Sequence, residues 1–243
     1  MKNLPAKVKK HIHQLEQVRR DFVANVSHEL RTPLTVIRGY IETLIKKNEC
    51  GEKYQKIFNQ MYEHSLRMEN IIDDLLLLSR LESEEQSLQE KSEVPVYELL
   101  KTLSLAAKEF SGDEKHEIIL DVDQALYLQG SEKELKSLFS NIIINAVKYT
   151  PPKGIITINW YREKNKAIFQ VTDTGIGIAK EHIHRITERF YRVDKARSRQ
   201  SGGTGLGLAI VKHVLLRHHG KLKIESEPGL GSTFTCIFPF FET

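Results

Sequence analysis

The sequence has few cysteines and no long apolar run, and both scarcities narrow what the chain can be. Its two cysteines, Cys50 and Cys236, form no disulfide or metal-ligand pattern, which is typical of a protein in a reducing compartment. The longest apolar stretches, residues 75–78 and 234–241, are far shorter than the roughly 20 residues of a membrane-spanning helix. Residues 1–20 are polar and basic, unlike a secretory signal peptide. We therefore expect a soluble chain that makes no membrane contact through this segment.

A strong excess of one charge is also missing. The 36 lysines and arginines exceed the 32 aspartates and glutamates only slightly, and a formal net charge of +4 does not indicate a nucleic-acid partner. The apolar content of 40% and the charged content of 28% are ordinary for a globular protein. A length of 243 residues is enough for two modest domains, each with its own core.

Apolar residues recur at every third or fourth position through most of the first 80 residues, which predicts a pair of long helices. The first runs over about residues 8–44, and a break follows at residues 48–51. On the second, apolar positions step regularly by four and three, as in a heptad seam. The members of this seam are Ile57, Met61, His64, Met68, Ile71, Leu75 and Leu78.

His28 is the candidate reactive residue of the first helix. It lies two residues from both Val26 and Leu30, so it points about 160–200° away from their apolar stripe and into solvent. Glu29 can accept a proton from one ring nitrogen and leave the other to attack an electrophile. Pro33 has no N–H for the carbonyl of Glu29, so the helix should bend one turn past the histidine. For a bare His-Glu pair, a solvated surface histidine is the ordinary alternative.

Two long amphipathic helices cannot bury wide apolar seams against each other alone. Pairing two hairpins into a four-helix bundle would bury them, so the sequence predicts a homodimer. The alternative is a monomeric hairpin docked on the second domain. His64 lies on the seam, and we expect it to be a core or near-core histidine rather than a ligand.

A polar segment at residues 83–95 is typical of a domain boundary, and we divide the chain into domains 1–88 and 89–243. Ser131 and Glu134 form a capping-box pattern that opens a helix. The expected helices are residues 96–110, 131–149, 180–189 and 206–219, and the expected strands are 117–122, 125–129, 155–162, 166–173, 221–226 and 232–239. Helices and strands in this order favour an α/β sandwich with helices on one face of a mixed sheet.

Asn141, Asn145 and Lys148 share one face of the expected helix 131–149. Side-chain amide oxygens can hold Mg²⁺, and an ammonium group can contact a phosphate. The pattern is weak alone, because asparagine and lysine are common at protein surfaces.

Two glycine-containing segments complete a candidate nucleotide site. Asp173 ends an apolar strand, where its carboxylate can accept from an exocyclic amine such as that of adenine, and Gly175 and Gly177 would let the backbone approach the ring. Residues 201–209 place glycines directly before a helix, where N–H groups and the helix dipole favour phosphate. Residues 192–200 between them are polar and basic, as a lid over a triphosphate would be. A turn and a flexible loop are the ordinary alternatives.

Together these motifs resemble the sensor histidine kinases of two-component signalling over nearly the whole chain. Residues 22–33 resemble their phosphoacceptor box, and residues 23–36 are most similar to the phosphate-regulon sensor subgroup. Asn141 with Asn145, and residues 173–177, 188–192 and 203–207, resemble the N, first glycine, F and second glycine boxes of their ATP domains. The sequence departs from the family pattern at Ala179, where proline is common, and at Thr187, where an aromatic residue is common.

The resemblance implies an α+β multidomain protein. Its helical hairpin would form a dimeric four-helix bundle, followed by an α/β sandwich ATP-binding domain of the histidine kinase, gyrase and chaperone type. His28 would be phosphorylated from ATP with Glu29 as general base, and would pass the phosphoryl group to an aspartate of a response-regulator receiver domain. Thr32 would position a water for dephosphorylation of that regulator.

The resemblance further implies ATP and Mg²⁺ as cofactors, with Asn141 and Asn145 facing the metal. The residues expected to bind the nucleotide are Asn141, Asn145, Lys148, Tyr149, Asp173, Gly175, Gly177, Arg192, Gly203, Thr204, Gly205, Leu206 and Gly207. The segment would be the cytoplasmic part of an inner-membrane sensor.

Two other functions compete with this interpretation. An ATP-driven clamp of the gyrase or chaperone kind would share the nucleotide fold but would need no exposed histidine on a coiled hairpin. A non-catalytic dimerisation scaffold would bind nucleotide only as a sensor, and the intact motifs argue against it. Metal binding by His182 with His184, or by His218 with His219, lacks a carboxylate or cysteine at useful spacing.

Overall fold

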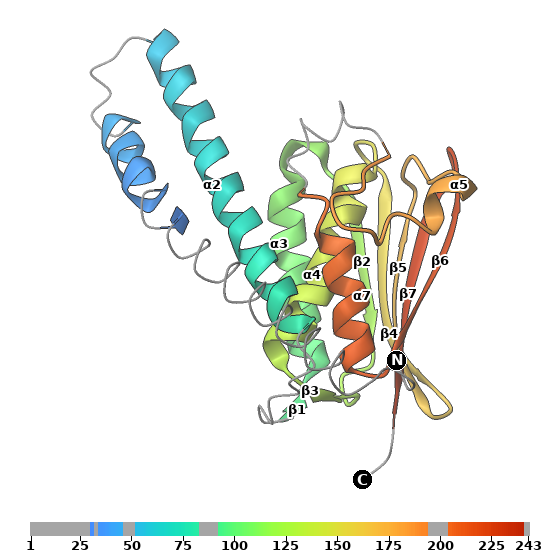
Figure 1. The fold of residues 1–243 in the computed structure, drawn as a ribbon. Coiled ribbons are helices and arrows are strands. Elements are labelled where there is room, and N and C mark those ends of the chain that lie inside the picture. The colour runs from blue at the N-terminus through green and yellow to red at the C-terminus, as the bar shows by residue number, and fades with distance from the viewer. Residues whose placement is uncertain (1–29, 32–33, 46–51, 83–91, 194–203, 241–243) are drawn as a thin grey trace, which may run out of the picture. The chain divides into compact units, whose positions relative to one another are not determined.

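The computed structural model describes residues 30–31, 34–45, 52–82, 92–193 and 204–240 (Figure 1). The chain separates into two compact units, Met1–Glu85 and Gln86–Thr243. The expected domain boundary after residue 88 lies in the segment 83–91, outside the described residues. Within the described ranges, no helix combines the length and the apolar character that crossing a bilayer requires.

The described part of the first unit includes two long helical stretches, residues 34–45 and α2 (Glu52–Leu81). The segment of α2 has no glycine or proline, which favours an uninterrupted helix of 30 residues. Leu34 packs with Ile72 and Leu76 in a small buried cluster that joins the two stretches. Ion pairs Arg31–Asp73 and Arg38–Glu69 connect them further along their polar sides.

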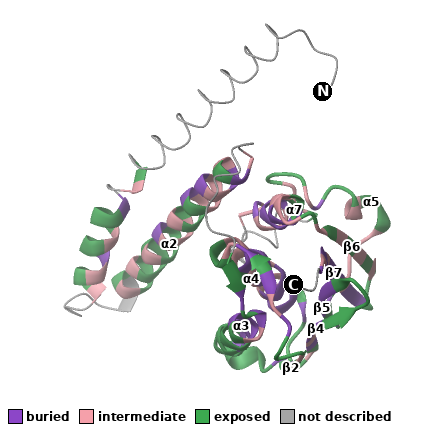
Figure 2. Ribbon diagram, turned by 90° about the horizontal axis from the view of Figure 1, so that it is seen from below, coloured by how far each residue is buried: buried purple, intermediate pink, exposed green. Residues whose placement is uncertain are grey.

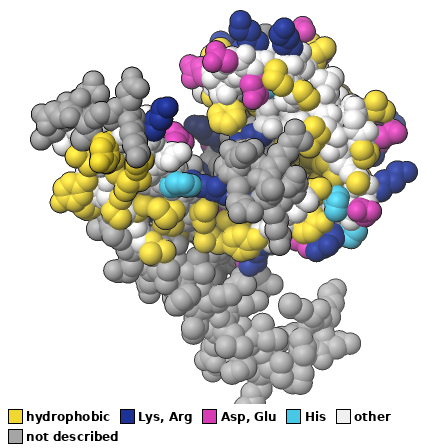
Figure 3. Space-filling view, turned by 90° about the horizontal axis from the view of Figure 1, so that it is seen from above, with side chains coloured by type: hydrophobic (Ala, Val, Ile, Leu, Met, Phe, Trp, Pro, Cys, Tyr) yellow, Lys and Arg dark blue, Asp and Glu magenta, His cyan; other side chains and the backbone are white. Residues whose placement is uncertain are grey.

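Much of the apolar surface of this unit is exposed within a single chain. Ile57, Met61 and Met68 of the heptad seam are 42–47% exposed, and Ile37 and Leu44 on the preceding stretch are exposed to a similar degree. Figure 3 shows hydrophobic side chains gathered along this unit. His64, expected to be buried on the seam, is also exposed in the single chain. The small cluster between the two stretches therefore uses Leu34, Ile72 and Leu76. Ile57, Met61 and Met68 of the heptad seam stay exposed in the single chain, whereas Leu78 at the end of the seam is buried.

The second unit is built on a five-stranded mixed sheet in the order β2-β4-β5-β7-β6. Its strands are β2 (Glu117–Val122), β4 (Ile155–Glu163), β5 (Lys166–Asp173), β6 (Lys221–Glu227) and β7 (Gly231–Pro239). Only β2 and β4 pair in parallel, and the chain between them passes through α4 (Glu132–Tyr149). Helices α3 (Val96–Ser111), α4 and α7 (Gly207–Arg217) cover one face of the sheet (Figure 1), which confirms the expected sandwich.

Aromatic side chains fill the space between the helices and the sheet. Phe139 of α4 lies with its ring centroid 4.6 Å from Phe169, 6.3 Å from Trp160 and 6.5 Å from Phe238. None of these four side chains is more than 1% exposed, and the buried residues of both layers face one another in Figure 2. The alternation of buried and exposed residues along β4 places every second side chain in this core.

Two expectations about short elements were wrong. β1 (Ser92–Val94) lies inside the expected linker and pairs antiparallel with β3 (Leu128–Gly130), which is shorter and later than the expected strand 125–129. The pairing joins segments far apart in sequence, so no local pattern marks it. The expected helix 180–189 is only α5 (Lys180–Ile183), followed by turns.

The capping box at the start of α4 also does not form. Ser131 occupies the N-cap position, as expected, but its side chain makes no capping hydrogen bond. Glu134 instead lies with a carboxylate oxygen 3.2 Å from Nε of Arg217 at the end of α7. The Glu134 carboxylate thus pairs with Arg217 of another helix instead of capping the start of α4.

Candidate functional site

Asp173 is a buried carboxyl at the end of β5. Its side chain accepts a hydrogen bond of 2.8 Å from the backbone N–H of Gly175, and the residue is only 6% exposed. Burial raises the pKa of the Asp173 carboxyl above its usual range, while hydrogen bonds from the backbone of Gly175 and Ser232 partly offset this increase. A buried acceptor in this position can recognise the amine of a ring placed beside it.

The glycine loop after Asp173 is held from two sides. The N–H of Ile176 donates to the carbonyl of Tyr149 at the end of α4, and the Ile176 carbonyl accepts from Gly229 in the β6–β7 turn. A Cβ on Gly177, where φ is +67°, would lie 2.0 Å from the carbonyl oxygen of Glu227. The sequence predicted that these glycines let the backbone approach a ligand. In the structure, Gly177 also lets the carbonyl of Glu227 approach the loop closely.

Ser226 is a part of this loop's support that sequence analysis missed. Its hydroxyl accepts from the N–H of Ile178 at 2.8 Å and donates to the carbonyl of Gly231 at 2.9 Å. The hydroxyl of Ser232 lies 2.9 Å away. The serine therefore ties the end of the glycine loop to the β6–β7 turn through tertiary contacts, which no local sequence signal reveals.

The asparagines lie on α4, as the spacing predicted. Nδ2 of Asn141 donates to the carbonyl of Ser137 at 2.9 Å, and a Cβ on Gly207 would lie 2.2 Å from Oδ1 of Asn141. The amide of Asn141 therefore adjoins the first turn of α7. Asn145 is half-buried one turn further along α4.

Lys148 and Tyr149 end the same helix. Nζ of Lys148 lies 5.8 Å from the centroid of the Phe110 ring, a cation–π arrangement. Tyr149 is 37% exposed, and its carbonyl is the one bonded to the glycine loop.

The second glycine segment brings α7 to the same place. Thr204 accepts a hydrogen bond from the N–H of Leu206 through its hydroxyl, and the Leu206 side chain is fully buried before the helix begins. Gly205, where φ is +75°, bonds through its carbonyl to the N–H of Phe190 at 2.8 Å. A Cβ on Gly205 would lie 2.9 Å from Cα of Phe190, so this glycine also serves close backbone packing.

The segment before residue 193 adopts an unusual conformation. Phe190 has a φ of +60° and is 59% exposed. The hydroxyl of the neighbouring Tyr191 lies 2.7 Å from Nδ1 of His182, and the Arg185 guanidinium lies 4.2 Å from the Tyr191 ring centroid. Arg192, the expected phosphate contact, is half-exposed directly after this anchored tyrosine.

The structure brings several of the expected nucleotide residues of the second unit into contact with distant segments of the chain. Gly175 adjoins Tyr149 at the end of α4, Gly177 adjoins Glu227 at the end of β6, and Gly205 and Gly207 adjoin Phe190 and Asn141. His28, Glu29, Thr32 and Gly203, together with most of the expected lid, lie outside the described residues. Within the described ranges, no three His, Cys, Asp or Glu side chains cluster as a metal site.

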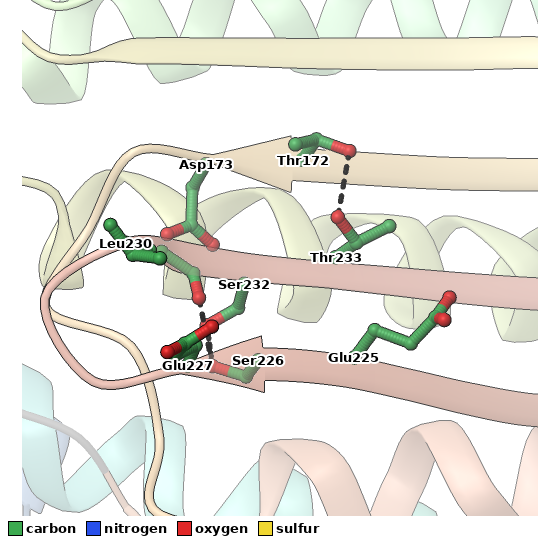
Figure 4. Close-up of a pocket in the computed structure, with 9 residues that line it drawn as sticks. Thr172, Asp173, Glu225, Ser226, Glu227, Leu230, Ser232 and Thr233 are labelled. Carbon is green, nitrogen blue, oxygen red and sulfur yellow. Dashed lines mark hydrogen bonds between the residues drawn. The ribbon is translucent and has the colours of Figure 1, made fainter.

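A hollow of about 280 Å³ lies at the ends of β5, β6 and β7 (Figure 4). Its lining includes Asp173, Glu225 and Glu227, and the hydroxyls of Thr172 and Thr233 are hydrogen-bonded at 3.1 Å. A triphosphate would be repelled by these carboxylates. The arrangement of glycines, asparagine and helix start around Gly207 fits phosphate better, because its N–H groups and amides carry no negative charge.

Comparison with known families divides the chain in the same way. The family described as "His Kinase A (phospho-acceptor) domain" matches residues 18–84. The family described as "Histidine kinase-, DNA gyrase B-, and HSP90-like ATPase" matches residues 130–242.

Curated relatives match over almost all of this chain. The phosphate regulon sensor protein PhoR of Pseudomonas aeruginosa is 53% identical over 93% of this chain and 51% of its own length. The sensor-like histidine kinase SenX3 of Mycobacterium tuberculosis is 37% identical over 93% of this chain and 55% of its own. The sensor histidine kinase WalK of Bacillus subtilis is 37% identical over 94% of this chain and 38% of its own length. The chain spans about half the length of the first two.

Solved structures are similar as well. Full-length ShkA in complex with AMPPNP superposes with a TM-score of 0.76 at 26% identity, covering 92% of this chain and 46% of that one. The Acinetobacter baumannii histidine kinase AdeS gives a TM-score of 0.62 at 22% identity, over 88% of this chain and 98% of its own, and supports the fold alone.

Proposed function

Because the chain belongs to the sensor histidine kinases of two-component systems, we propose that it transfers the γ-phosphoryl group of ATP to its own His28. The observation that carries the proposal is the convergence of motifs separated in sequence. Gly175 lies against the end of α4, and Gly207 lies against Asn141 of the same helix. The order and spacing of these motifs suit a nucleotide, and residues 18–84 match the phosphoacceptor family.

In the proposed complex, Asp173 recognises the adenine amine and the turn of α4 bearing Asn141 and Asn145 faces the metal. Mg²⁺ would neutralise phosphate charge there, since amide oxygens are suitable ligands. The phosphates would be held by the ends of α4 and α7 and by the segments that precede α7. The residues proposed for this role are Lys148, Tyr149, Arg192, Gly203, Thr204, Gly205, Leu206 and Gly207.

In the transfer, one imidazole nitrogen of His28 attacks the γ-phosphorus in line. An N–P bond forms, the bond from the γ-phosphorus to the bridging oxygen breaks, and ADP leaves with that electron pair. Glu29 accepts the proton from the other ring nitrogen. Phosphoryl transfer depends mainly on positioning and charge neutralisation, so the hinge between the proposed domains 1–88 and 89–243 matters as much as the nucleophile.

The phosphorylated histidine would then donate to an aspartate of a response-regulator receiver domain that docks on the helical hairpin. Thr32, one turn after His28, would position a water molecule for the opposite activity, which is dephosphorylation of the regulator. Identity of 53% to a phosphate regulon sensor favours a regulator of that system. The reaction would take place in the cytoplasm, where ATP is available, as part of a membrane-anchored sensor.

A homodimer is proposed for the hairpin unit. Ile57, Met61 and Met68 lie on one helix face, and each remains 42–47% exposed in the single chain. A second copy would cover this face and complete a four-helix bundle.

The decisive experiment is incubation with Mg²⁺ and γ-labelled ATP, beside the variant His28→Gln. We expect acid-labile, alkali-stable label on the wild type, no label on the variant, and equal ATP binding by both. Label that persists on the variant would place the acceptor elsewhere. Release of phosphate with no protein-bound label, unchanged by the substitution, would instead favour an ATPase clamp.

Thr32→Ala separates the two proposed activities of the hairpin. It should spare autophosphorylation and slow dephosphorylation of the regulator. An equal loss of both would make Thr32 a structural residue.

A further inference from the structure

His116 is a buried histidine that the proposed chemistry does not use. Its side chain is 0% exposed, and it lies between the end of α3 and the start of β2. A buried polar ring is destabilising unless its nitrogens are hydrogen-bonded, so a buried histidine needs partners. Both ring nitrogens of His116 have partners.

The two nitrogens reach in opposite directions. Nδ1 lies 2.9 Å from the hydroxyl of Ser111, which also accepts from the His116 backbone N–H at 3.0 Å. Nε2 lies 3.0 Å from the carbonyl oxygen of Thr150 and 3.5 Å from a carboxylate oxygen of Glu114. A carbonyl only accepts, so Nε2 carries the hydrogen and donates it.

Thr150 is the C-cap of α4, directly after Tyr149. The hydroxyl and N–H of Thr150 both bond back to the carbonyl of Ala146, and its own carbonyl bonds to His116. The carbonyl of Tyr149, one peptide earlier, accepts from the N–H of Ile176 in the glycine loop. Of these two consecutive carbonyls, that of Tyr149 bonds to the glycine loop and that of Thr150 bonds to the buried His116.

We propose that His116 is a positioning residue for the nucleotide site, which rests on the proposed function. By fixing the Thr150 carbonyl, it sets the direction of the Tyr149 carbonyl and with it the place of residues 174–177 beside Asp173. An imidazole suits this role because its two nitrogens lie on opposite sides of a rigid ring. One side chain thereby links the end of α3 to the end of α4.

A purely structural role is the competing account. The backbone N–H of Lys153 bonds to the carbonyl of Glu114, and that of Glu117 bonds to the carbonyl of Gly154. These two bonds already tie the turn after α4 to the start of β2. If they suffice, replacing His116 would lower stability and leave nucleotide affinity unchanged.

Two amide variants separate the accounts. His116→Gln places an amide nitrogen near the position of Nε2 and can still donate to Thr150. His116→Asn has the same chemistry but reaches only the Nδ1 side, toward Ser111. Ser111→Ala removes the other partner and leaves the bond to Thr150 in place. The full 243-residue chain is used throughout.

The first readout is the Kd for Mg·ADP by calorimetry, at a temperature where thermal unfolding shows each variant to be folded. We expect His116→Asn to raise Kd about tenfold, as loss of one hydrogen bond permits. His116→Gln and Ser111→Ala should stay within about threefold of the wild type. The proposal would be overturned if both amide variants bound Mg·ADP as tightly as the wild type, or if both lost affinity to the same extent.

The second readout is hydrogen exchange without nucleotide. In His116→Asn the Ile176 amide should exchange faster than in His116→Gln, while the Lys153 and Glu117 amides keep their protection. Equal protection of Ile176 in the two variants would also contradict the proposal. A wild type that binds no Mg·ADP would instead remove the proposed function itself, so the two failures are distinguishable.

Discussion

The two units of this chain bury their apolar residues in different ways. The second unit encloses Phe139, Trp160 and Phe169 almost completely between its helices and sheet. Among the described residues of the first unit, Leu34 packs in a small cluster with Ile72 and Leu76, while Met61 and Met68 of the heptad seam are exposed. One unit is complete within a single chain, and the other has a face that suits a second copy.

The difference implies that the stability of the two units responds differently to protein concentration. A core enclosed within one chain has a stability that does not depend on protein concentration. A helical unit that relies on a partner is stabilised by mass action instead. Trp160 is the only tryptophan and lies in the second unit, so its fluorescence reports that unit alone.

The largest effect should come from emptying the enclosed core. We expect Phe139→Ala to lower the free energy of unfolding of the second unit by about 3–5 kcal/mol, because the space between Trp160 and Phe169 cannot close completely. Urea unfolding followed by Trp160 fluorescence measures it. Met68→Ala in the first unit is the control and should leave that transition in place. A loss below about 1 kcal/mol for Phe139→Ala would mean that this core tolerates cavities and that the contrast is overstated.

The next effect should appear in the first unit. Met61→Glu would place a charge on the seam in both copies, and we expect the dimer Kd to rise by about two orders of magnitude. Analytical ultracentrifugation over a concentration series measures it. Asn70→Glu adds the same charge at an exposed position about 180° around α2 from Met61, and should leave the dimer intact. An unchanged dimer with Met61→Glu would show that another surface joins the copies.

A third prediction concerns the charge inside the second unit. The pKa of Asp173 is raised by burial, so folding favours its protonated form. The wild type should therefore lose stability, relative to Asp173→Asn, as pH rises from below the unfolded pKa of about 3.9 through the raised folded value. At neutral pH, Asp173→Asn should be at least as stable as the wild type, but it should bind ATP more weakly.

Urea unfolding at several pH values, beside calorimetry with ATP, checks both parts of this prediction. A stability difference that is flat with pH would show that the hydrogen bonds to Gly175 and Ser232 cancel the effect of burial. Unchanged nucleotide affinity would remove Asp173 from the adenine site.

The smallest effect should follow from restoring the family residue at Ala179. Its φ of −66° is the value that a proline ring imposes. Ala179→Pro should stabilise the second unit by about 0.4–1 kcal/mol through reduced freedom of the unfolded chain. Lys115→Pro, at a φ of +51°, is the contrasting variant and should destabilise it. Differential scanning calorimetry distinguishes the two, and a lower Tm for Ala179→Pro would contradict the prediction.

The sequence predicted the long elements well because their periodic patterns are local. The strand Lys166–Asp173 has the expected bounds, and α4 and α7 each lie within two residues of expectation. The three-residue strand β1 escaped prediction and β3 was expected with the wrong bounds, since each pairs with a segment far away in the sequence. The carboxylate of Glu134 was assigned to a local cap because its ion pair with Arg217 is also a tertiary contact.

The candidate site divides in the same way. The spacing of the motifs reflects the elements that carry them, and the structure brings Gly207 against Asn141 of α4, while the roles of these residues and of Asp173 stay predictions. Ser226 and His116 were missed, since each bonds to a backbone group far away in the sequence. The left-handed conformation of Phe190 also has no sequence signal, because glycine and asparagine are the residues that usually adopt it.

The pairing of β5 with β7 has a consequence for how this protein can evolve. Asp173 lies opposite Ser232 in the sheet, so residues 174–220 form an excursion that leaves one strand and returns by way of β6 to the strand beside it. The entropy of closing such a loop grows slowly, by about 0.6 kcal/mol for each doubling of its length. Insertions into the turns of this excursion would therefore add little to the entropy of closing it, whereas Ile210, Val211 and Val214 of α7 are fully buried and restrict substitution. The segments proposed to bind the nucleotide thus combine turns whose length can change with a helix whose buried face cannot, so evolution can alter the length of the site more readily than its support.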